Sequence, residues 1–446
     1  MKIALSIAGS DSGGGAGIQA DLKMFSALNV YGCTAITAIT AQNTKHVTQI
    51  FEIPPPMVEQ QIRSILVDMR PNAIKIGMVY SSSIIDAVYS SLKKITFKIP
   101  IVLDPILAAG TGAKLLRTDA YKSFVSKLIP LCTIITPNRM EAEKLANIVI
   151  KTENDAIEAA RKINKLGAEN ILVKGGHADS AYITDLLIDG KGDTTKFTNP
   201  RLKIRETHGS GCNFSSAVTA YLAKGIGLVQ ACKMANEHIH AAIKNAVTVG
   251  KGLPIANPLS VIHRDASRYR TLEDLQQAAE QLSMLDGFYK LIPETQTNFV
   301  YAIPDAVDTS DVAAVRGRII RIENTAMPAS YVKFGASSHV ASAIIVYMSF
   351  KPEFRSAINI RCDERIVDVC KSLFSVASYD RVKEPKKMKR QEGSTVRWGV
   401  LSALSKNPLA EIIYHTGDIG KEPMIILFGR NPAEVVKKIK AIMENY

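Results

Sequence analysis

Short apolar runs alternate with amphipathic, helix-like segments along the first part of the chain. Continuous apolar runs, which are typical of strands buried on both faces, predict strands at 2–8, 35–40, 73–76, 101–103, 134–135 and 171–173. Apolar residues at helical spacing predict helices at 18–28, 56–68, 84–94, 120–128, 138–146, 153–166 and 212–223. This alternation predicts an α/β fold whose mostly parallel sheet is covered by helices.

The pattern is interrupted after a further predicted helix at 228–249. Residues 250–258 are rich in glycine and proline, which end helices, and a new amphipathic helix is expected to begin near Ser267. The remainder mixes predicted strands with predicted helices, the strands at 319–322, 343–348 and 424–428 and the helices at 363–375 and 433–443. A chain of 446 residues exceeds most single domains, so we expect one domain at 1–262 and a smaller α/β domain at 267–446.

A glycine-rich turn, Thr-His-Gly-Ser-Gly-Cys at 207–212, stands between a basic segment at 201–205, predicted to be a strand, and a predicted helix. Gly209, Ser210 and Gly211 leave the first N–H groups of that helix open, and the helix dipole adds positive charge, so the turn predicts an anion site. Cys212, on the first helical turn, is expected to have a lowered pKa and to lie beside a phosphoryl group.

Polar or glycine-rich loops also follow the other predicted strands. They lie at 9–21, 41–44, 75–78, 103–105, 136–143 and 174–177. Ligands of open parallel sheets bind at the carboxyl ends of the strands, so these loops are expected to build one site.

The order and local sequence of these loops closely resemble the hydroxymethylpyrimidine kinase / hydroxymethylpyrimidine phosphate kinase of thiamine synthesis, in the ribokinase superfamily. The resemblance covers roughly residues 1–260. It implies a ribokinase-like sandwich that uses ATP and Mg²⁺ to phosphorylate hydroxymethylpyrimidine and then its phosphate. Related kinases also suggest a homodimer.

The resemblance implies a substrate-binding role for Asp21, Gln42 and Met78. Gln42 can offer a donor and an acceptor to the ring-nitrogen and amino edge of the pyrimidine, and Met78 an apolar face. From the residues alone, Met78 could equally belong to the core, and Asp21 could be a solvated position on its helix.

Asp104, Asn138 and Glu141 carry oxygen ligands suited to Mg²⁺, directly or through water. Glu141 is expected to hold the metal, and Asp104 and Asn138 to lie at the ATP phosphates. From spacing alone, Asn138 could equally be a helix N-cap and Glu141 its capping-box partner. Lys174 is expected to reach the phosphates as a point charge. Ribokinase-like enzymes generally place an aspartate base where this chain has Cys212, so the resemblance implies that Cys212 is the general base; His208 is a second candidate.

Glycine- and serine-rich segments beside arginines recur in the second predicted domain, at 315–319, 334–341, 359–363, 392–399 and 412–424. As a set they resemble the archaeal-type thiamine phosphate synthase domain, over about 267–446. The resemblance implies that pyrimidine pyrophosphate is joined to thiazole phosphate with loss of pyrophosphate. It implies that Arg318 pairs with pyrophosphate and that His339 hydrogen-bonds or protonates it, with Arg316, Arg321 and Arg361 as alternatives for the arginine.

A different interpretation of the second domain stays open. It could bind thiamine phosphate without catalysis and regulate the kinase. Nucleic-acid binding through the basic run at 381–390 is not expected, because no helix-turn-helix or stacking aromatics accompany it. Small anionic substrates account for the net charge of +13.

The remaining composition excludes several classes of protein. No apolar run approaches the roughly 18 residues of a membrane span, and the first apolar run is better interpreted as a strand than as a signal peptide, so a cytoplasmic protein is expected. The cysteines are scattered without a CxxC pair, which favours reduced thiols over a zinc site or disulfides.

Overall fold

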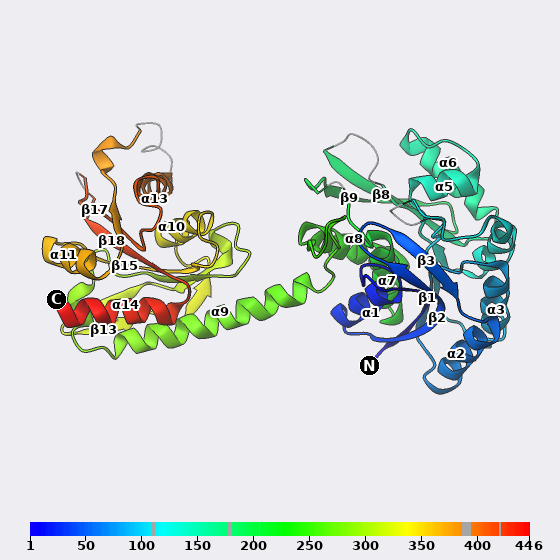
Figure 1. Cartoon of the computed structure of the whole chain (residues 1–446), viewed down its shortest axis with the longest axis horizontal. Coiled ribbons are helices and arrows are strands. Elements are labelled where there is room, and N and C mark those ends of the chain that lie inside the picture. The colour runs from blue at the N-terminus through cyan, green and yellow to red at the C-terminus, as the bar shows by residue number, and fades with distance from the viewer. Residues whose placement is uncertain (109–111, 176–180, 205, 386–393, 419–420) are drawn as a thin grey trace. The chain divides into compact units, whose positions relative to one another are not determined.

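The computed structural model describes residues 1–108, 112–175, 181–204, 206–385, 394–418 and 421–446. The chain divides into two compact units, Met1–Ile262 and His263–Tyr446 (Figure 1). Each unit has its own sheet and its own apolar cores. The helix that we expected to begin near Ser267 begins earlier, since α9 spans Ser260–Ser283.

Among the described residues of the first unit, nine strands form one sheet. Their order across the sheet is β3 (Val47–Glu52), β2 (Tyr31–Gln42), β1 (Ile3–Asp11), β4 (Ala73–Ile76), β5 (Ile101–Leu103), β6 (Ile134–Ile135), β7 (Asn170–Val173), β8 (Tyr182–Ile188) and β9 (Thr194–Pro200). Neighbouring strands in the run β2-β1-β4-β5-β6-β7 pair in parallel. At the two edges of the sheet, β3 pairs antiparallel with β2, β8 with β7, and β9 with β8. The predicted mostly parallel sheet is therefore confirmed. The strand predicted at 201–205 is wrong, because β9 ends at Pro200.

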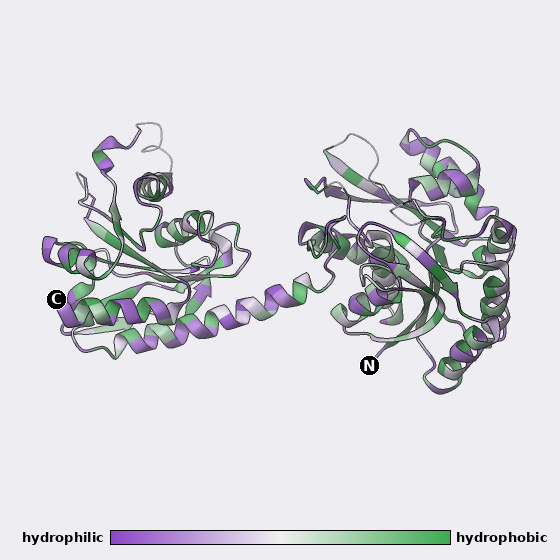
Figure 2. Cartoon of the chain, viewed as in Figure 1, coloured by the Kyte–Doolittle hydropathy of each residue, from purple (hydrophilic) through white to green (hydrophobic). Residues whose placement is uncertain are grey.

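Helices cover both faces of this sheet. They are α1 (Gly17–Ala27), α2 (Pro55–Asp68), α3 (Ser82–Leu92), α5 (Arg139–Ala146), α6 (Glu153–Asn164), α7 (Ser210–Ala223) and α8 (Leu228–Lys244). Successive strand residues face opposite sides. Leu5 accordingly lies in the core with α2, α3, α5 and α6, and Ala4 in the core with α1, α7 and α8. In Figure 2 the central strands are correspondingly hydrophobic.

One predicted helix of this unit is not continuous. Over 120–128 the chain forms the end of a 3-10 turn (Thr118–Ala120), the short helix α4 (Tyr121–Ser123) and a π turn (Phe124–Leu128). A 3-10 turn containing Pro130 follows. These segments lie away from the cavity described below.

The second unit is built on a seven-stranded sheet in its described residues. The order is β14 (Val332–Phe334), β11 (Val312–Val315), β10 (Phe299–Ala302), β15 (Ser356–Arg361), β18 (Met424–Gly429), β17 (Ile412–His415) and β16 (Val376–Ser378). A separate hairpin pairs β12 (Ile319–Ile322) with β13 (Thr325–Pro328). One core is formed with α9, α11 (Glu364–Leu373) and α14 (Pro432–Asn445), and the other with α10 (His339–Met348) and α13 (Ser394–Lys406). The unit is therefore α/β, as predicted.

The strand predicted at 343–348 is wrong, because these residues belong to α10. Ala343, Ile344, Val346, Tyr347 and Met348 are all buried, so the segment is apolar on every side. A short apolar run of this kind shows no periodicity that separates a buried helix from a buried strand.

Candidate functional site

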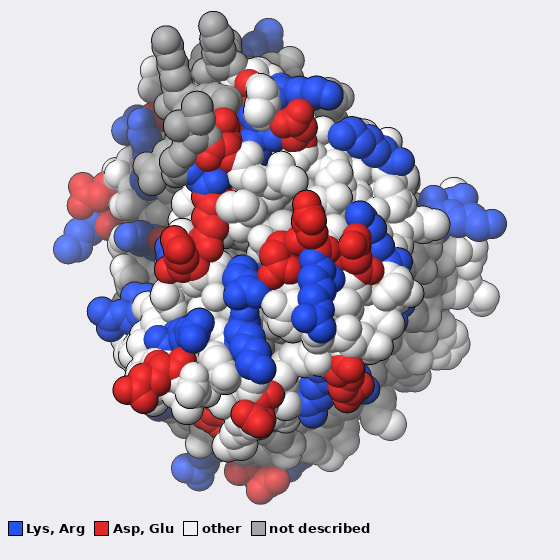
Figure 3. All heavy atoms as spheres, turned by 90° about the vertical axis from the view of Figure 1, so that its left-hand side faces the viewer, with Lys and Arg blue, Asp and Glu red and all other residues white. Residues whose placement is uncertain are grey.

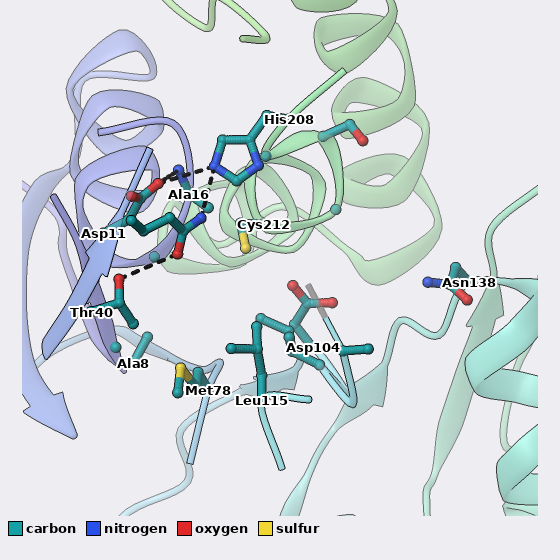
Figure 4. Close-up of a pocket in the computed structure, with 18 of the residues that line it drawn as sticks. Ala8, Asp11, Ala16, Thr40, Met78, Asp104, Leu115, Asn138, His208 and Cys212 are labelled. Atoms are coloured by element: carbon teal, nitrogen blue, oxygen red, sulfur yellow. Dashed lines mark hydrogen bonds and ion pairs between the residues drawn. The ribbon is translucent and has the colours of Figure 1, made fainter. Parts of the chain in front are cut away.

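A cavity lies at the carboxyl ends of the parallel strands of the first unit. All but one of the site residues predicted there line it, namely Gln42, Met78, Asp104, Asn138, Glu141, Lys174, Gly209, Ser210, Gly211 and Cys212. Figure 4 shows Met78 and Thr40 toward one end, Asp104 and Asn138 toward the other, and Cys212 between them. Of the 174–177 loop, Gly176 and His177 lie outside the described residues.

The glycine-rich turn adopts a conformation that only glycine allows at this place. Gly209 has φ 81° and precedes α7, for which no side chain provides a cap. A Cβ on Gly209 would lie 1.8 Å from the carbonyl oxygen of Gly15. The first-turn N–H groups of α7, beginning at Ser210, are therefore left for a ligand, as an anion site at a helix N-terminus requires.

The Cys212 side chain lies between the starts of two helices. Its sulfur accepts a hydrogen bond from the N–H of Gly17, the first residue of α1, and Cys212 itself is on the first turn of α7. Burial raises the pKa of the thiol to about 12, the Lys75 ammonium lowers it, and the Asp104 carboxylate raises it further. The expected lowered pKa is therefore wrong, because loss of hydration outweighs the helix termini and the nearby cation.

Asp21 does not line the cavity but lies buried behind it. Its Oδ1 is 2.5 Å from Lys75 Nζ, and the hydroxyls of Ser6 and Ser216 donate hydrogen bonds to its carboxylate. The interpretation of Asp21 as a solvated helix position is wrong, since the residue is fully buried. Lys75, which does line the cavity, also lies 3.4 Å from the Cys212 carbonyl oxygen.

Sequence reasoning did not single out Lys75. A signal was present, because Lys75 is the one charged residue in the buried strand β4. A buried ammonium needs a paired anion, so an aspartate partner could have been sought.

Asp104 and Lys174 form an ion pair in the cavity. Lys174 Nζ lies 3.3 Å from Asp104 Oδ1, and the Ser215 hydroxyl donates to Asp104 Oδ2 over 3.2 Å. Burial would lower the pKa of Lys174, but the Asp104 and Glu141 carboxylates raise it above its ordinary value, so the amine is cationic. A Cβ on Gly211 would lie 3.2 Å from this amine, so Lys174 lies beside the glycine-rich turn.

Asn138 and Glu141 form a capping box at the start of α5. The Glu141 N–H donates to Asn138 Oδ1 over 2.9 Å, and the Asn138 N–H donates to Glu141 Oε2 over 2.8 Å. The capping interpretation is thus confirmed, although both residues also line the cavity. Burial raises the pKa of Glu141 to about 7. The Lys174 ammonium lowers this pKa, and the Asp104 carboxylate raises it.

The other end of the cavity combines an apolar and a polar wall. Met78 is buried against Ala38 and Leu115, so it belongs to a small core cluster and lines the cavity at the same time. The Gln42 amide faces the ring of His208, with the two Nε2 atoms 3.1 Å apart. His208 in turn lies 3.1 Å from Asp11 Oδ2, as the dashed lines of Figure 4 show.

Arg318 and His339 occupy different elements of the second unit. Arg318 stands between β11 and β12 with φ 72°, an uncommon backbone for a non-glycine residue, and its guanidinium donates to the Thr295 carbonyl. His339 is the first residue of α10, with Nδ1 3.2 Å from the Ser338 hydroxyl.

The alternative arginines already have polar partners. Arg361 contacts Asp363 over 2.8 Å and the Tyr446 hydroxyl over 2.7 Å. Arg316 contacts the Tyr331 hydroxyl, and Arg321 donates to the Glu323 carbonyl.

The described residues contain neither a cluster of metal ligands nor a membrane-spanning helix. They contain no group of three or more His, Cys, Asp or Glu side chains arranged to hold a metal ion. None of their helices is long and apolar enough to cross a membrane. On the face in Figure 3, basic and acidic side chains lie side by side. Of the basic run at 381–390, residues 386–390 lie outside the described part of the chain.

Comparisons with known proteins cover both units. Residues 11–257 match the family model of phosphomethylpyrimidine kinase, and residues 274–441 match that of thiamine-phosphate synthase ThiN. The bifunctional thiamine biosynthesis protein ThiDN of Methanocaldococcus jannaschii is 31% identical over 449 residues, covering 100% of this chain and 99% of that protein. The hydroxymethylpyrimidine/phosphomethylpyrimidine kinase of Bacillus subtilis is 41% identical over 56% of this chain and 92% of its own.

Solved structures similar to the first unit include the ADP complex of Bacillus subtilis pyridoxal kinase. It has a TM-score of 0.54 and 36% identity, covering 59% of this chain and 99% of that one. Staphylococcus aureus pyridoxal kinase in complex with AMP-PCP and pyridoxal has a TM-score of 0.53 and 31% identity, covering 58% and 94%. The predicted ribokinase-like fold of the first unit is confirmed. The chain therefore belongs to the phosphomethylpyrimidine kinase family of thiamine biosynthesis and carries a thiamine-phosphate synthase ThiN domain after its kinase domain.

Proposed function

We propose that the first unit transfers the γ-phosphoryl group of ATP to 4-amino-5-hydroxymethyl-2-methylpyrimidine and then to the phosphate so formed. The observation that carries this proposal is the order of groups along the cavity. Figure 4 shows Met78 and Thr40 at one end, Asp104 and Asn138 at the other, and Cys212 between them. Gln42 contacts Thr40 at the first end, and Lys174 pairs with Asp104 at the second, beside Gly211 of the glycine-rich turn. A flat polar heterocycle at the first end would direct its hydroxymethyl group toward phosphates at the second.

Transfer of the phosphoryl group depends mainly on positioning and charge neutralisation. The hydroxymethyl oxygen forms a bond to the γ-phosphorus while the bond from that phosphorus to the bridging oxygen of ADP breaks. Lys174 and the first N–H groups of α7 would stabilise the transferred group. For the second phosphorylation, an oxygen of the pyrimidine phosphate replaces the hydroxyl as the attacking atom.

Cys212 would accept the proton of the attacking hydroxyl as a thiolate. Burial keeps the resting sulfur protonated, and the groups that favour the thiolate are the Lys75 ammonium and the Gly17 N–H. Asp21 would act through Lys75, since its carboxylate holds that ammonium in the buried space behind the cavity. We therefore assign Asp21 a positioning role instead of direct contact with the pyrimidine.

Asp104 and Glu141 fit the requirements of a magnesium site. The Asp104 carboxylate raises the pKa of Glu141, and a cation between or near them would relieve that repulsion. Mg²⁺ commonly binds through one or two carboxylates, water and substrate phosphates, where it neutralises phosphate charge. Asp104 and Asn138 would orient the nucleotide phosphates directly or through that hydration shell.

We propose that the second unit joins the pyrimidine pyrophosphate to thiazole phosphate. The thiazole nitrogen forms a bond to the pyrimidine methylene carbon while the carbon–oxygen bond to pyrophosphate breaks. Arg318 would pair with the departing pyrophosphate and His339 would hydrogen-bond to it. The ThiN match and the full-length similarity to ThiDN favour this function over a purely regulatory domain. A cytoplasmic location and a homodimer remain predictions.

An assay of the full chain with the pyrimidine, ATP, Mg²⁺ and thiazole phosphate tests both activities. We expect ADP, the pyrimidine phosphate and pyrophosphate, and thiamine phosphate, each identified by mass. Pyridoxal serves as a competing alcohol, because the similar solved structures are pyridoxal kinases. Faster phosphorylation of pyridoxal would overturn the substrate assignment, and kinase products without thiamine phosphate would overturn the synthase assignment.

A further inference from the structure

Asp11 is held as a hydrogen-bond acceptor at the start of the first glycine-rich loop. The N–H of Gly13 donates to its Oδ1 over 2.8 Å, and those of Gly15 and Ala16 donate to its Oδ2 over 3.1 and 2.8 Å. Burial alone would raise the pKa of Asp11, but hydrogen bonds from His208 and the backbone lower it below its ordinary value. Asp11 is therefore a carboxylate, which only accepts hydrogen bonds.

This carboxylate determines which nitrogen of His208 carries a hydrogen. His208 Nε2 lies 3.1 Å from Asp11 Oδ2, so Nε2 must be the donor of that pair. The imidazole is also fixed in place, because His208 is buried and a Cβ on Gly15 would lie only 2.4 Å from its Cδ2. The His208 backbone is pinned by its N–H bond to the Pro254 carbonyl.

The same His208 Nε2 faces the terminal amide of Gln42 at 3.1 Å. An Nε2–H donor requires the amide oxygen there, not the amide NH₂. The contact of the Gln42 amide with Thr40, on its other side, requires the same orientation of the amide. The Thr40 hydroxyl has one hydrogen, which the Ser10 carbonyl at 3.0 Å receives, so Thr40 can only accept from Gln42 at its 3.2 Å contact.

We infer that Asp11 and His208 are positioning residues that hold the Gln42 amide with its oxygen toward His208 and its NH₂ toward Thr40. A half-turn of the amide about its last side-chain bond gives this arrangement. The one Nε2 hydrogen of His208 is then shared between Asp11 Oδ2 and the amide oxygen, and the amide NH₂ donates to Thr40. His208 thus acts through Gln42 rather than on the transferred proton.

A fixed amide makes the site selective for one order of donor and acceptor, if the pyrimidine binds here as proposed above. A 4-aminopyrimidine presents an amino donor beside a ring-nitrogen acceptor, whereas its 4-oxo analogue presents an acceptor beside an N–H donor. The hydroxymethyl group must point toward the phosphates, so the ring cannot turn over to compensate. A site that is built to hydrogen-bond one pattern leaves its own groups unpaired with the other.

The test compares kcat and KM for the 4-amino substrate and its 4-oxo analogue in the full chain. Wild-type protein is expected to have a higher kcat/KM for the amino compound than for the oxo analogue. His208→Phe keeps an aromatic ring but has no hydrogen-bond donor. We expect it to reduce the ratio of the two kcat/KM values at least about tenfold, chiefly through KM. His208→Gln restores a donor and should restore most of the preference.

The outcomes separate this inference from the proposed function. If the wild type does not phosphorylate the amino compound, the substrate assignment of the proposed function is wrong. A normal preference in His208→Phe overturns the positioning role, as does an equal loss of kcat for both compounds. Should His208→Phe not fold, ¹⁵N shifts of the wild-type imidazole decide the matter, and an Nε2 without hydrogen would refute the inference.

Discussion

Lys75 Nζ lies 2.5 Å from Asp21 Oδ1, and both side chains are completely excluded from solvent. Removing one partner of such a buried pair leaves an uncompensated charge, which typically costs about 3–5 kcal/mol. Asp21→Asn and Lys75→Met are each expected to destabilise the first unit by this order, and the double variant Asp21→Asn/Lys75→Met by less than the sum of the two. Urea unfolding followed by circular dichroism measures these effects.

The chain supplies an internal control for that measurement. Its single tryptophan, Trp398, lies in the second unit, so its fluorescence reports unfolding there. The fluorescence transition should stay unchanged in all three variants. Additive single-variant effects in the double variant would contradict a direct Lys75–Asp21 interaction.

The alkaline pH dependence of the kinase tests Cys212 as the base. Burial raises the pKa of its thiol to about 12, so the thiolate fraction of the free protein grows through the alkaline range. We expect kcat/KM for the pyrimidine to rise by about tenfold per pH unit above roughly pH 8, where Glu141 is already ionised. Cys212→Ala should lose both phosphorylations and this slope while keeping nucleotide binding. A flat profile would exclude the thiolate as the base.

The sheet and the site loops could be predicted because parallel strands are continuous apolar runs and their ends carry distinctive polar residues. The Cys212 pKa could not, since it depends on burial by α1 and α7 together, which are far apart in the sequence. The buried pairing of Asp21 could not be predicted for the same reason, as Asp21 lies on α1 and its partner Lys75 on β4. In the second unit, the buried helix α10 shows no polar face that would have distinguished it from a strand.

Gly209→Ala should disrupt the anion site at α7. The substitution would bring a Cβ within 1.8 Å of the Gly15 carbonyl at a left-handed φ of 81°. Gly225→Ala is a matched control, because Gly225 has nearly the same φ, 82°, with nothing within 4 Å of the new Cβ. We expect Gly209→Ala to weaken ATP binding at least about tenfold by calorimetry and Gly225→Ala to leave it unchanged. If both substitutions weakened ATP binding equally, the loss would come from backbone strain alone and not from disruption of the anion site.

The raised pKa of Glu141 predicts that the folded protein becomes less stable as the pH rises. Burial raises its pKa to about 7 from an ordinary 4.5, so the folded protein binds more protons than the unfolded chain between these values. The free energy of unfolding should therefore fall from about pH 4.5 to 7, and less so in Glu141→Gln. Magnesium chloride should recover stability near pH 7.5 in the wild type, and Glu141→Gln should reduce that recovery. An unchanged magnesium effect in Glu141→Gln would remove Glu141 from the metal site.

Arg318 and His339 should be required for the second activity and dispensable for the first. Arg318→Ala and His339→Ala are expected to lower thiamine phosphate formation at least about a hundredfold, because removal of one charge-stabilising donor commonly costs this much. Arg361→Ala is the matched control, since that guanidinium is already engaged by Asp363 and Tyr446. Supplying the full-length variants with pyrimidine pyrophosphate and thiazole phosphate isolates the coupling step from both phosphorylations. Normal coupling in Arg318→Ala together with its loss in Arg361→Ala would transfer the pyrophosphate contact to Arg361. In a second assay with the pyrimidine and ATP, loss of ADP formation in any of the three variants would show that the substitution acts on the kinase as well.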